Sequence, residues 1–154
     1  MEDKYINIHF QVNHPLTEED LNFLKKTDTI YFSHSFNQPI DILQNHKTLE
    51  KLFLWSKFNY TIDNLPNIKC LDLGNFFNKP IENLPYSLLY LSLGENFNQN
   101  LDFLPPFLLK LTIHNPNYSH DLLNLPKSLK KIIISKRYKG YINIPEGCKL
   151  LYSS

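Results

Sequence analysis

The sequence contains no alanine, only four glycines, and no excess of charge of either sign. Its 16 lysine and arginine side chains are balanced by 15 aspartate and glutamate side chains, which leaves a net charge of +1. This balance argues against a general binder of nucleic acids or anionic membranes, because such proteins usually carry a marked basic excess. The few glycines form no loop that could cradle phosphate groups.

Long apolar runs and cysteine pairs are also missing. No stretch approaches the roughly 20 apolar residues of a membrane-spanning helix, and the start, MEDKYINIHF, lacks the basic end and apolar run of a secretory signal. Cys70 and Cys148 lie far apart and provide neither a disulfide framework nor a metal-ligand spacing. We therefore expect a cytoplasmic protein. Hydrophobic residues make up 42% of the 154 positions, enough for one domain with a continuous core.

What fills the chain is a repeated unit, seen most clearly in residues 88–105, LLYLSLGENFNQNLDFLP. Each unit has the order Leu-x-x-Leu-x-Leu, Phe-Asn, Ile or Leu, and finally Leu-Pro. The central position of the first motif recurs at intervals of 19 to 22 residues, at Ile30, Leu52, Leu71, Leu91, Leu111 and Ile132. Self-similarity at this period is the sequence signature of a solenoid.

Each part of the unit predicts a structural element. The leucine motif predicts a short strand with its leucines turned inward. The ring that follows predicts an aromatic stack away from the strands, and the asparagine after it is expected to be buried, with its amide satisfying backbone groups of adjacent turns. Leu-Pro should bend the chain into the next strand. The remaining residues are too few for a helix, so the side opposite the strands should be extended or 3₁₀-like.

The two ends of the chain differ from the repeats. Alternation over residues 5–12 predicts a strand, and Thr17, followed by acidic residues, predicts the start of a helix over about residues 18–26. Residues 1–26 are thus interpreted as an N-terminal cap, residues 27–147 as repeats, and residues 148–154 as a truncated strand that closes the far end. Together they predict one solenoid domain over residues 1–154.

The repeated Phe-Asn-x-x-Ile motif, flanked by Leu-Pro and Leu-x-x-Leu-x-Leu, resembles the FNIP repeat, a relative of the leucine-rich repeat. Its clearest copies are residues 36–40, 58–62, 77–81 and 97–101. FNIP proteins are known mainly from social amoebae and from giant viruses of amoebae. The resemblance implies a mainly β, leucine-rich-repeat-like solenoid of about six turns, with a parallel sheet on its concave face that recognises proteins. Some members also carry an F-box, but only about 26 residues precede the repeats here, so we expect no F-box in residues 1–26.

Residues that alternate with the inward leucines should face outward and provide the candidate binding site. They comprise an aromatic cluster on the early turns, a basic group on the late turns that also includes Lys136 and Arg137, and single polar residues between them. The candidate partner-binding residues are Tyr31, Phe53, Trp55, Tyr90, Lys51, Asp72, Lys110 and Lys131. Clustered exposed aromatics are typical of protein interfaces. The alternative is that the rings only pack on one another and stabilise the sheet, and that the cations form an ordinary solvated surface.

The sequence favours a non-enzymatic protein-interaction module that binds a partner protein or peptide, as a monomer or with weak self-association. Single-stranded nucleic-acid binding through the aromatic and lysine side chains, or a structural and self-assembling role, are the alternatives. The histidines show no metal-ligand spacing, and Asp72 has no second carboxylate beside it, so we expect no catalytic residue, metal or cofactor. His34 and His114 are expected to lie four turns apart, roughly 19 Å at the usual strand separation.

Overall fold

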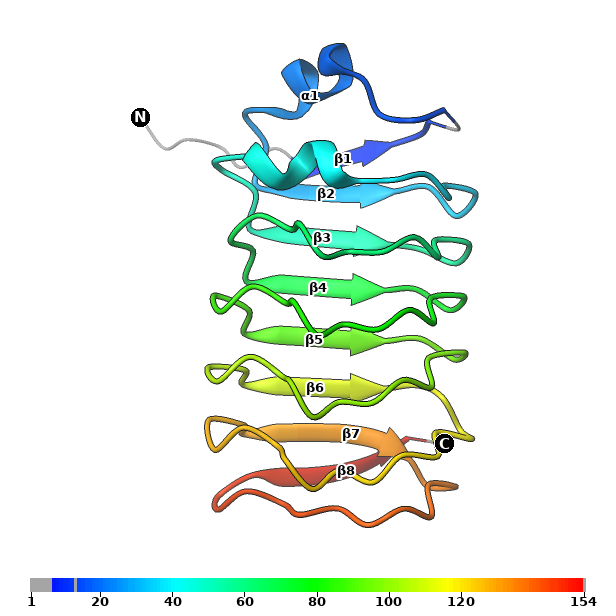
Figure 1. Ribbon diagram of the computed structural model, residues 1–154, viewed down its shortest axis with the longest axis vertical. Coiled ribbons are helices and arrows are strands. Elements are labelled where there is room, and N and C mark those ends of the chain that lie inside the picture. The colour runs from blue at the N-terminus through cyan, green and yellow to red at the C-terminus, as the bar shows by residue number, and fades with distance from the viewer. Residues whose placement is uncertain (1–6, 13, 154) are drawn as a thin grey trace.

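The computed structural model describes residues 7–12 and 14–153, which form a stack of coils with a parallel sheet along one side (Figure 1). The described strands follow one another in chain order, and every neighbouring pair is parallel. In chain order the elements are β1 (Asn7–Phe10), α1 (Glu18–Leu24), β2 (Thr29–Phe32), η1 (Asp41–Asn45), β3 (Lys51–Leu54), β4 (Cys70–Leu73), β5 (Tyr90–Leu93), β6 (Lys110–Ile113), β7 (Lys131–Ser135) and β8 (Lys149–Ser153). The expected leucine-rich-repeat-like solenoid is confirmed.

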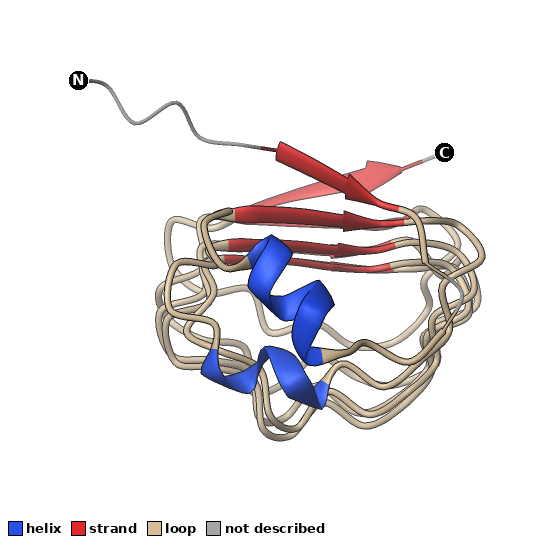
Figure 2. Ribbon diagram, turned by 90° about the horizontal axis from the view of Figure 1, so that it is seen from above, coloured by secondary structure: helices blue, strands red, loops and turns tan. Residues whose placement is uncertain are grey.

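The sheet is hollowed along the length of the solenoid. Seen down the stack, β1 and β8 stand further from the loops than the strands between them (Figure 2). The outward face of the sheet is therefore concave, as expected. The loops close the other side of each coil, and the described part of the chain contains no helix long and apolar enough to cross a membrane.

The leucine motif builds the inner wall of the core. In β3, Leu52 and Leu54 are buried, whereas Lys51 is exposed and Phe53 is half-buried. Strand pairing places Leu52 against Leu71, so that the inward leucines form continuous rows from turn to turn. Each fully buried leucine contributes about 1.5–3 kcal/mol of hydrophobic stabilisation.

A second wall is made by the aromatic ring of each repeat. Neighbouring rings in the series are parallel to within 14°, with centroids 6.1 to 6.4 Å apart. The members of the stack are Phe36, Phe58, Phe77, Phe97 and Tyr118, all at most 3% exposed. The Tyr118 hydroxyl donates to the Gln99 carbonyl (3.0 Å), so the hydroxyl that tyrosine adds is satisfied in the core. The expected aromatic stack is present.

The asparagine after each ring joins adjacent turns. The Asn59, Asn78 and Asn98 backbone N–H groups each donate to the Oδ1 atom of the asparagine one turn earlier, at 2.9 to 3.0 Å. The expected hydrogen-bonding role is therefore present. The expectation that these side chains are buried is wrong, because they are half-buried or exposed.

The first and last turns follow the sequence pattern with small shifts. Thr17 and Asp20 form a capping box at the start of α1, but the helix ends at Leu24, shorter than expected, because the Thr27 N–H donates to the Leu24 carbonyl (2.8 Å) and turns the chain. Of the strand expected over residues 5–12, the structure describes β1, and residues 5 and 6 lie outside the described part. At the far end, β8 pairs with β7 over five register positions.

Candidate binding surface on the sheet

The outward face of the sheet carries parallel rows of side chains, fixed by the strand register. The third residue of each strand forms one row, here called the third-position row, which runs along the solenoid as His9, Tyr31, Phe53, Asp72, Ser92, Thr112, Ile133 and Leu151. Large rings at its start give way to short polar side chains on β4, β5 and β6. The row therefore steps down in height across the middle of the sheet.

Aromatic side chains form a rigid group at the high end of this row. The rings of Tyr31 and Phe53 stack with their centroids 4.4 Å apart and their planes 9° apart, and His9 stacks on the other face of Tyr31 at 4.8 Å. Trp55, just after β3, is 42% exposed and packs against His34 with centroids 4.7 Å apart. The rings thus pack on one another, as the alternative interpretation of the cluster predicts, but this packing leaves Trp55 partly exposed to solvent.

Glycine occupies the position after the strand in two adjacent turns. A Cβ atom at Gly74 would collide with the backbone of Leu54 and Trp55, and one at Gly94 with the backbone of Gly74 and Asn75. These contacts require glycine, because the turns approach too closely for any side chain. In the row of positions directly after the strands, Gly74 and Gly94 therefore leave a floor without side chains between Trp55 after β3 and His114 after β6, here called the glycine floor.

The low part of the third-position row and the two glycines together leave a hollow of about 500 Å³, here called the glycine hollow. Its walls include Tyr31, Phe53 and Trp55 at one end and His114 at the other, and Asp72, Ser92 and Glu95 also line it. Pockets that hold ligands typically combine such apolar rings with a few polar groups.

The carboxylate of Asp72 is in an unfavourable environment in the lining of the glycine hollow. Burial raises its pKa, while a hydrogen bond from the Ser92 hydroxyl and the nearby His114 act in the opposite direction. Over residues 7–12 and 14–153 the ion pairs are His14–Asp20 and Lys69–Glu50, so no lysine or arginine of this region pairs with Asp72. A carboxylate whose charge is disfavoured in the free protein is more typical of a functional site than of a structural one.

Replacing Asp72 by asparagine should show this cost as a pH dependence of stability. Because the folded-state pKa lies above the ordinary value of 3.8, the folded chain binds more protons than the unfolded chain between the two pKa values, and stability falls as pH rises through that window. Asp72→Asn removes this loss, so its free energy of unfolding should exceed that of the wild type at about pH 7.5 and approach it below about pH 4. Urea unfolding at both pH values measures the difference. A variant less stable than the wild type at neutral pH would contradict the assignment.

A second hollow of about 420 Å³ adjoins the first across β3 to β7. It shares Phe53 and Asp72 with the glycine hollow and adds Tyr90 and Lys110.

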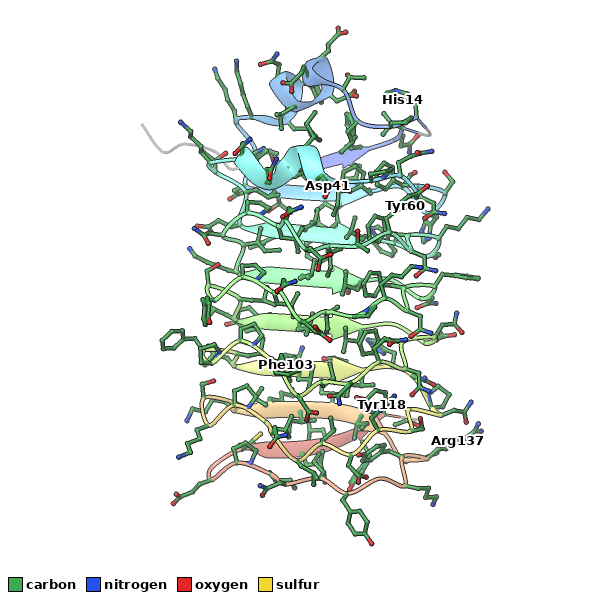
Figure 3. The ribbon with its side chains drawn as sticks, in the orientation of Figure 1. His14, Asp41, Tyr60, Phe103, Tyr118 and Arg137 are labelled. Carbon is green, nitrogen blue, oxygen red and sulfur yellow. The ribbon has the colours of Figure 1, made fainter. Side chains whose placement is uncertain are left out.

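The structure sorts the candidate partner-binding residues into three groups. Tyr31, Phe53, Trp55 and Asp72 meet in the glycine hollow, Tyr90 and Lys110 line its neighbour, and Lys51 and Lys131 line neither. Lys110, Lys131 and Lys149 also lie side by side in register on adjacent strands. Arg137 lies at the bend after β7 (Figure 3).

Several residues of the glycine hollow were not among the candidates. His34 and His114, although separated by four turns, line the same hollow, and Glu95 lines it as well. The available signal was glycine at the same repeat position in two successive copies, at 74 and 94, because a missing side chain in adjacent turns leaves a gap in the surface. Glu95 follows Gly94 directly and could have been placed with it.

A larger hollow, of about 640 Å³, lies on the loop side and is lined by Tyr86, Phe103 and Asp102. There the pKa of Asp102 is lowered by hydrogen bonds from the side chains of Asn124 and Asn100. This carboxylate already has its partners and joins neighbouring turns, so it has a structural role. In the described part of the chain, no group of three or more His, Cys, Asp or Glu side chains is arranged to hold a metal ion.

No protein-family model and no curated protein matches this sequence. Among solved structures, that of CroV588, described as a novel circular LRR (leucine-rich repeat) protein, is similar to 95% of this chain, with a TM-score of 0.78 and 29% sequence identity. The chain spans 23% of the length of that protein. The solenoid is therefore leucine-rich-repeat-like, a fold that commonly serves as a protein-interaction scaffold.

Proposed function

We propose that this chain is a non-enzymatic interaction module that binds an extended segment of a partner protein on the concave face of its sheet. The observation that carries the proposal is the glycine hollow, in which a solvent-exposed tryptophan stands beside a floor without side chains. Tryptophan and tyrosine are enriched among the residues that dominate binding energy at protein interfaces.

The rigidity of the surface supports this function. Tyr31 and Phe53 are held by stacking, Trp55 is held against His34, and the strands below are fixed by the leucine rows. A surface already ordered in the free protein loses little side-chain entropy on binding, so more of the contact energy appears as affinity.

The repeat class is part of the same proposal. The Phe-Asn-x-x-Ile copies support FNIP-type repeats over residues 27–147, between the caps at residues 1–26 and 148–154. The stacked rings and the asparagine hydrogen bonds give these motif positions a structural purpose. The motif then builds the scaffold, and the residues that vary between copies select the partner.

Trp55→Ala is expected to reduce peptide binding at least tenfold, because the main ring of the hollow is lost. The measurement is retention of labelled protein on immobilised random hexapeptides. The free energy of unfolding should fall by less than the roughly 3–5 kcal/mol expected for a fully buried ring, because Trp55 is 42% exposed.

The matched control is Phe103→Ala, which removes a ring that is 68% exposed and lines the loop-side hollow. This variant should bind as the wild type does. Loss of binding with Phe103→Ala, together with normal binding by Trp55→Ala, would move the interaction surface to the loop side.

One observation favours single-stranded nucleic acid as a second candidate ligand. Lys110, Lys131 and Lys149 are aligned on adjacent strands, and Tyr90, the register partner of Lys110, could stack on a base. A mobility-shift titration with a single-stranded oligonucleotide at low salt separates the two functions, because phosphate contacts weaken steeply as salt is added. The protein-binding proposal expects no retarded complex even at low salt.

A further inference from the structure

The lining of the glycine hollow carries negative charge without positive charge. Asp72 and Glu95 both belong to it, and no lysine or arginine does. The lining also contains two histidines, His34 and His114. On a chain with a net charge of +1, this hollow is a local acidic site.

Asp72 forms no ion pair with a lysine or arginine of the described residues. Burial raises the pKa of this carboxyl and is the larger effect, whereas the nearby Ser92 hydroxyl and His114 lower it. A ligand that brought a cation to this carboxylate would supply the missing interaction, because opposite charges attract more strongly where water is partly excluded.

The aromatic walls suit the same kind of ligand. Phe53 stacks on Tyr31 through one face, and since β4 follows β3 in the sheet, its other face is turned toward Asp72, its register partner. Trp55 stands beside the glycine floor at the same end of the hollow. Cations are attracted to the faces of aromatic rings, most strongly to tryptophan. Ring faces and a carboxylate thus converge on one space.

We propose that the glycine hollow binds the lysine or arginine side chain of a partner protein, with the cationic group held between Asp72 and the rings of Phe53 and Trp55. This inference rests on the proposed function of the same surface and names the chemistry that it recognises. The floor formed by Gly74 and Gly94 spans two strand positions, about 10 Å at the usual strand separation, which gives room for the long aliphatic part of either side chain. Glu95 adds a second negative charge at the floor.

The test uses the full chain and hexapeptide sublibraries, each with one amino acid fixed at a central position and the others randomised, at about pH 8 and about 0.15 M salt, where long-range charge effects are screened. The lysine and arginine sublibraries should retain at least about five times more protein than the norleucine, leucine or glutamate sublibraries. Trp55 is the only tryptophan of the chain, so its fluorescence should change on titration with a retained peptide.

Asp72→Asn separates recognition of the cation from binding in general. Its retention on the lysine and arginine sublibraries should fall at least about fivefold, to the level of the neutral sublibraries, while retention on the neutral sublibraries should stay unchanged. Glu82→Gln is the matched control, because it removes the same charge from the loop-side hollow, and it should bind as the wild type does.

The possible failures are distinguishable. Equal retention on neutral and cationic sublibraries, or a lysine preference that survives in Asp72→Asn, overturns recognition of a cation and leaves the peptide-binding function standing. No retention on any sublibrary overturns both. An equal loss of binding in Glu82→Gln and Asp72→Asn also overturns the inference, because the preference would then reflect net charge.

Discussion

Phe77→Ala is expected to lower the free energy of unfolding by about 3–5 kcal/mol, the usual cost of deleting a buried phenyl ring. Phe77 is completely buried and stacks on Phe58 and Phe97, with centroids 6.1 and 6.2 Å away. Alanine would leave a cavity that the neighbouring rings cannot fill without leaving their own turns. Because each repeat contacts only its neighbours, the loss weakens two interfaces at once. Urea unfolding, followed by circular dichroism, measures the effect.

The adjacent ring is the control for this prediction. Phe76 is 57% exposed and lies outside the aromatic stack, so Phe76→Ala should change stability by no more than about 0.5 kcal/mol. The two variants delete the same group at consecutive positions, and they differ only in which ring faces the core. A large loss for Phe76→Ala and a small one for Phe77→Ala would mean that the register of the repeat is shifted by one residue.

The contrast between Phe76 and Phe77 also shows why the fold could be predicted from the sequence. A ring that recurs at the same place in each copy, such as Phe77, has to serve the core, because successive coils present the same position to the same neighbour. A ring without counterparts, such as Phe76, has no such constraint. Repetition therefore separates structural residues from others, and it predicted the strands, the aromatic stack and the asparagine hydrogen bonds.

The binding surface could be predicted only in part, for a physical reason. The outward residues Tyr31, Phe53, Trp55 and Asp72 follow from alternation along the strands, and the structure brings them together. The glycine hollow depends on how far the side chains of five neighbouring turns extend, which is a property of the assembled surface. Their expected separation of four turns, roughly 19 Å at the usual strand separation, suggested that His34 and His114 act apart. The hollow is several strands wide and includes both.

The asparagines show the opposite limit. Their partners were predicted correctly and their burial was not, because a hydrogen bond between turns can form on either side of the bend. The side-chain oxygens of Asn59 and Asn78 each accept a hydrogen bond from the backbone N–H of the next turn, although Asn59 is half-buried and Asn78 is exposed. Sequence spacing fixes which turn is reached, and the path of the loop decides how much water reaches the bond.

Gly94→Ala is expected to destabilise the fold by about 1–3 kcal/mol or more, the range for atoms forced into a closely packed site. The added Cβ would meet the carbonyl group of Gly74 and the Cα atom of Asn75. Both belong to the backbone, so no side-chain rotation can relieve the collision, and two turns of the solenoid have to separate. The same displacement raises the floor of the glycine hollow, so peptide retention should fall together with the melting temperature.

Gly147→Asn is the control, because that glycine is needed for a different reason. Its φ angle is +71°, and a Cβ there would have nothing within 4 Å. Asparagine tolerates this left-handed conformation better than most residues, so stability should change little. If Gly94→Ala instead unfolds at the wild-type urea concentration and still binds peptide, the turns do not approach closely at this point. The scaffold and the floor of the binding surface would then be independent of each other, whereas the structure makes a single pair of glycines responsible for both.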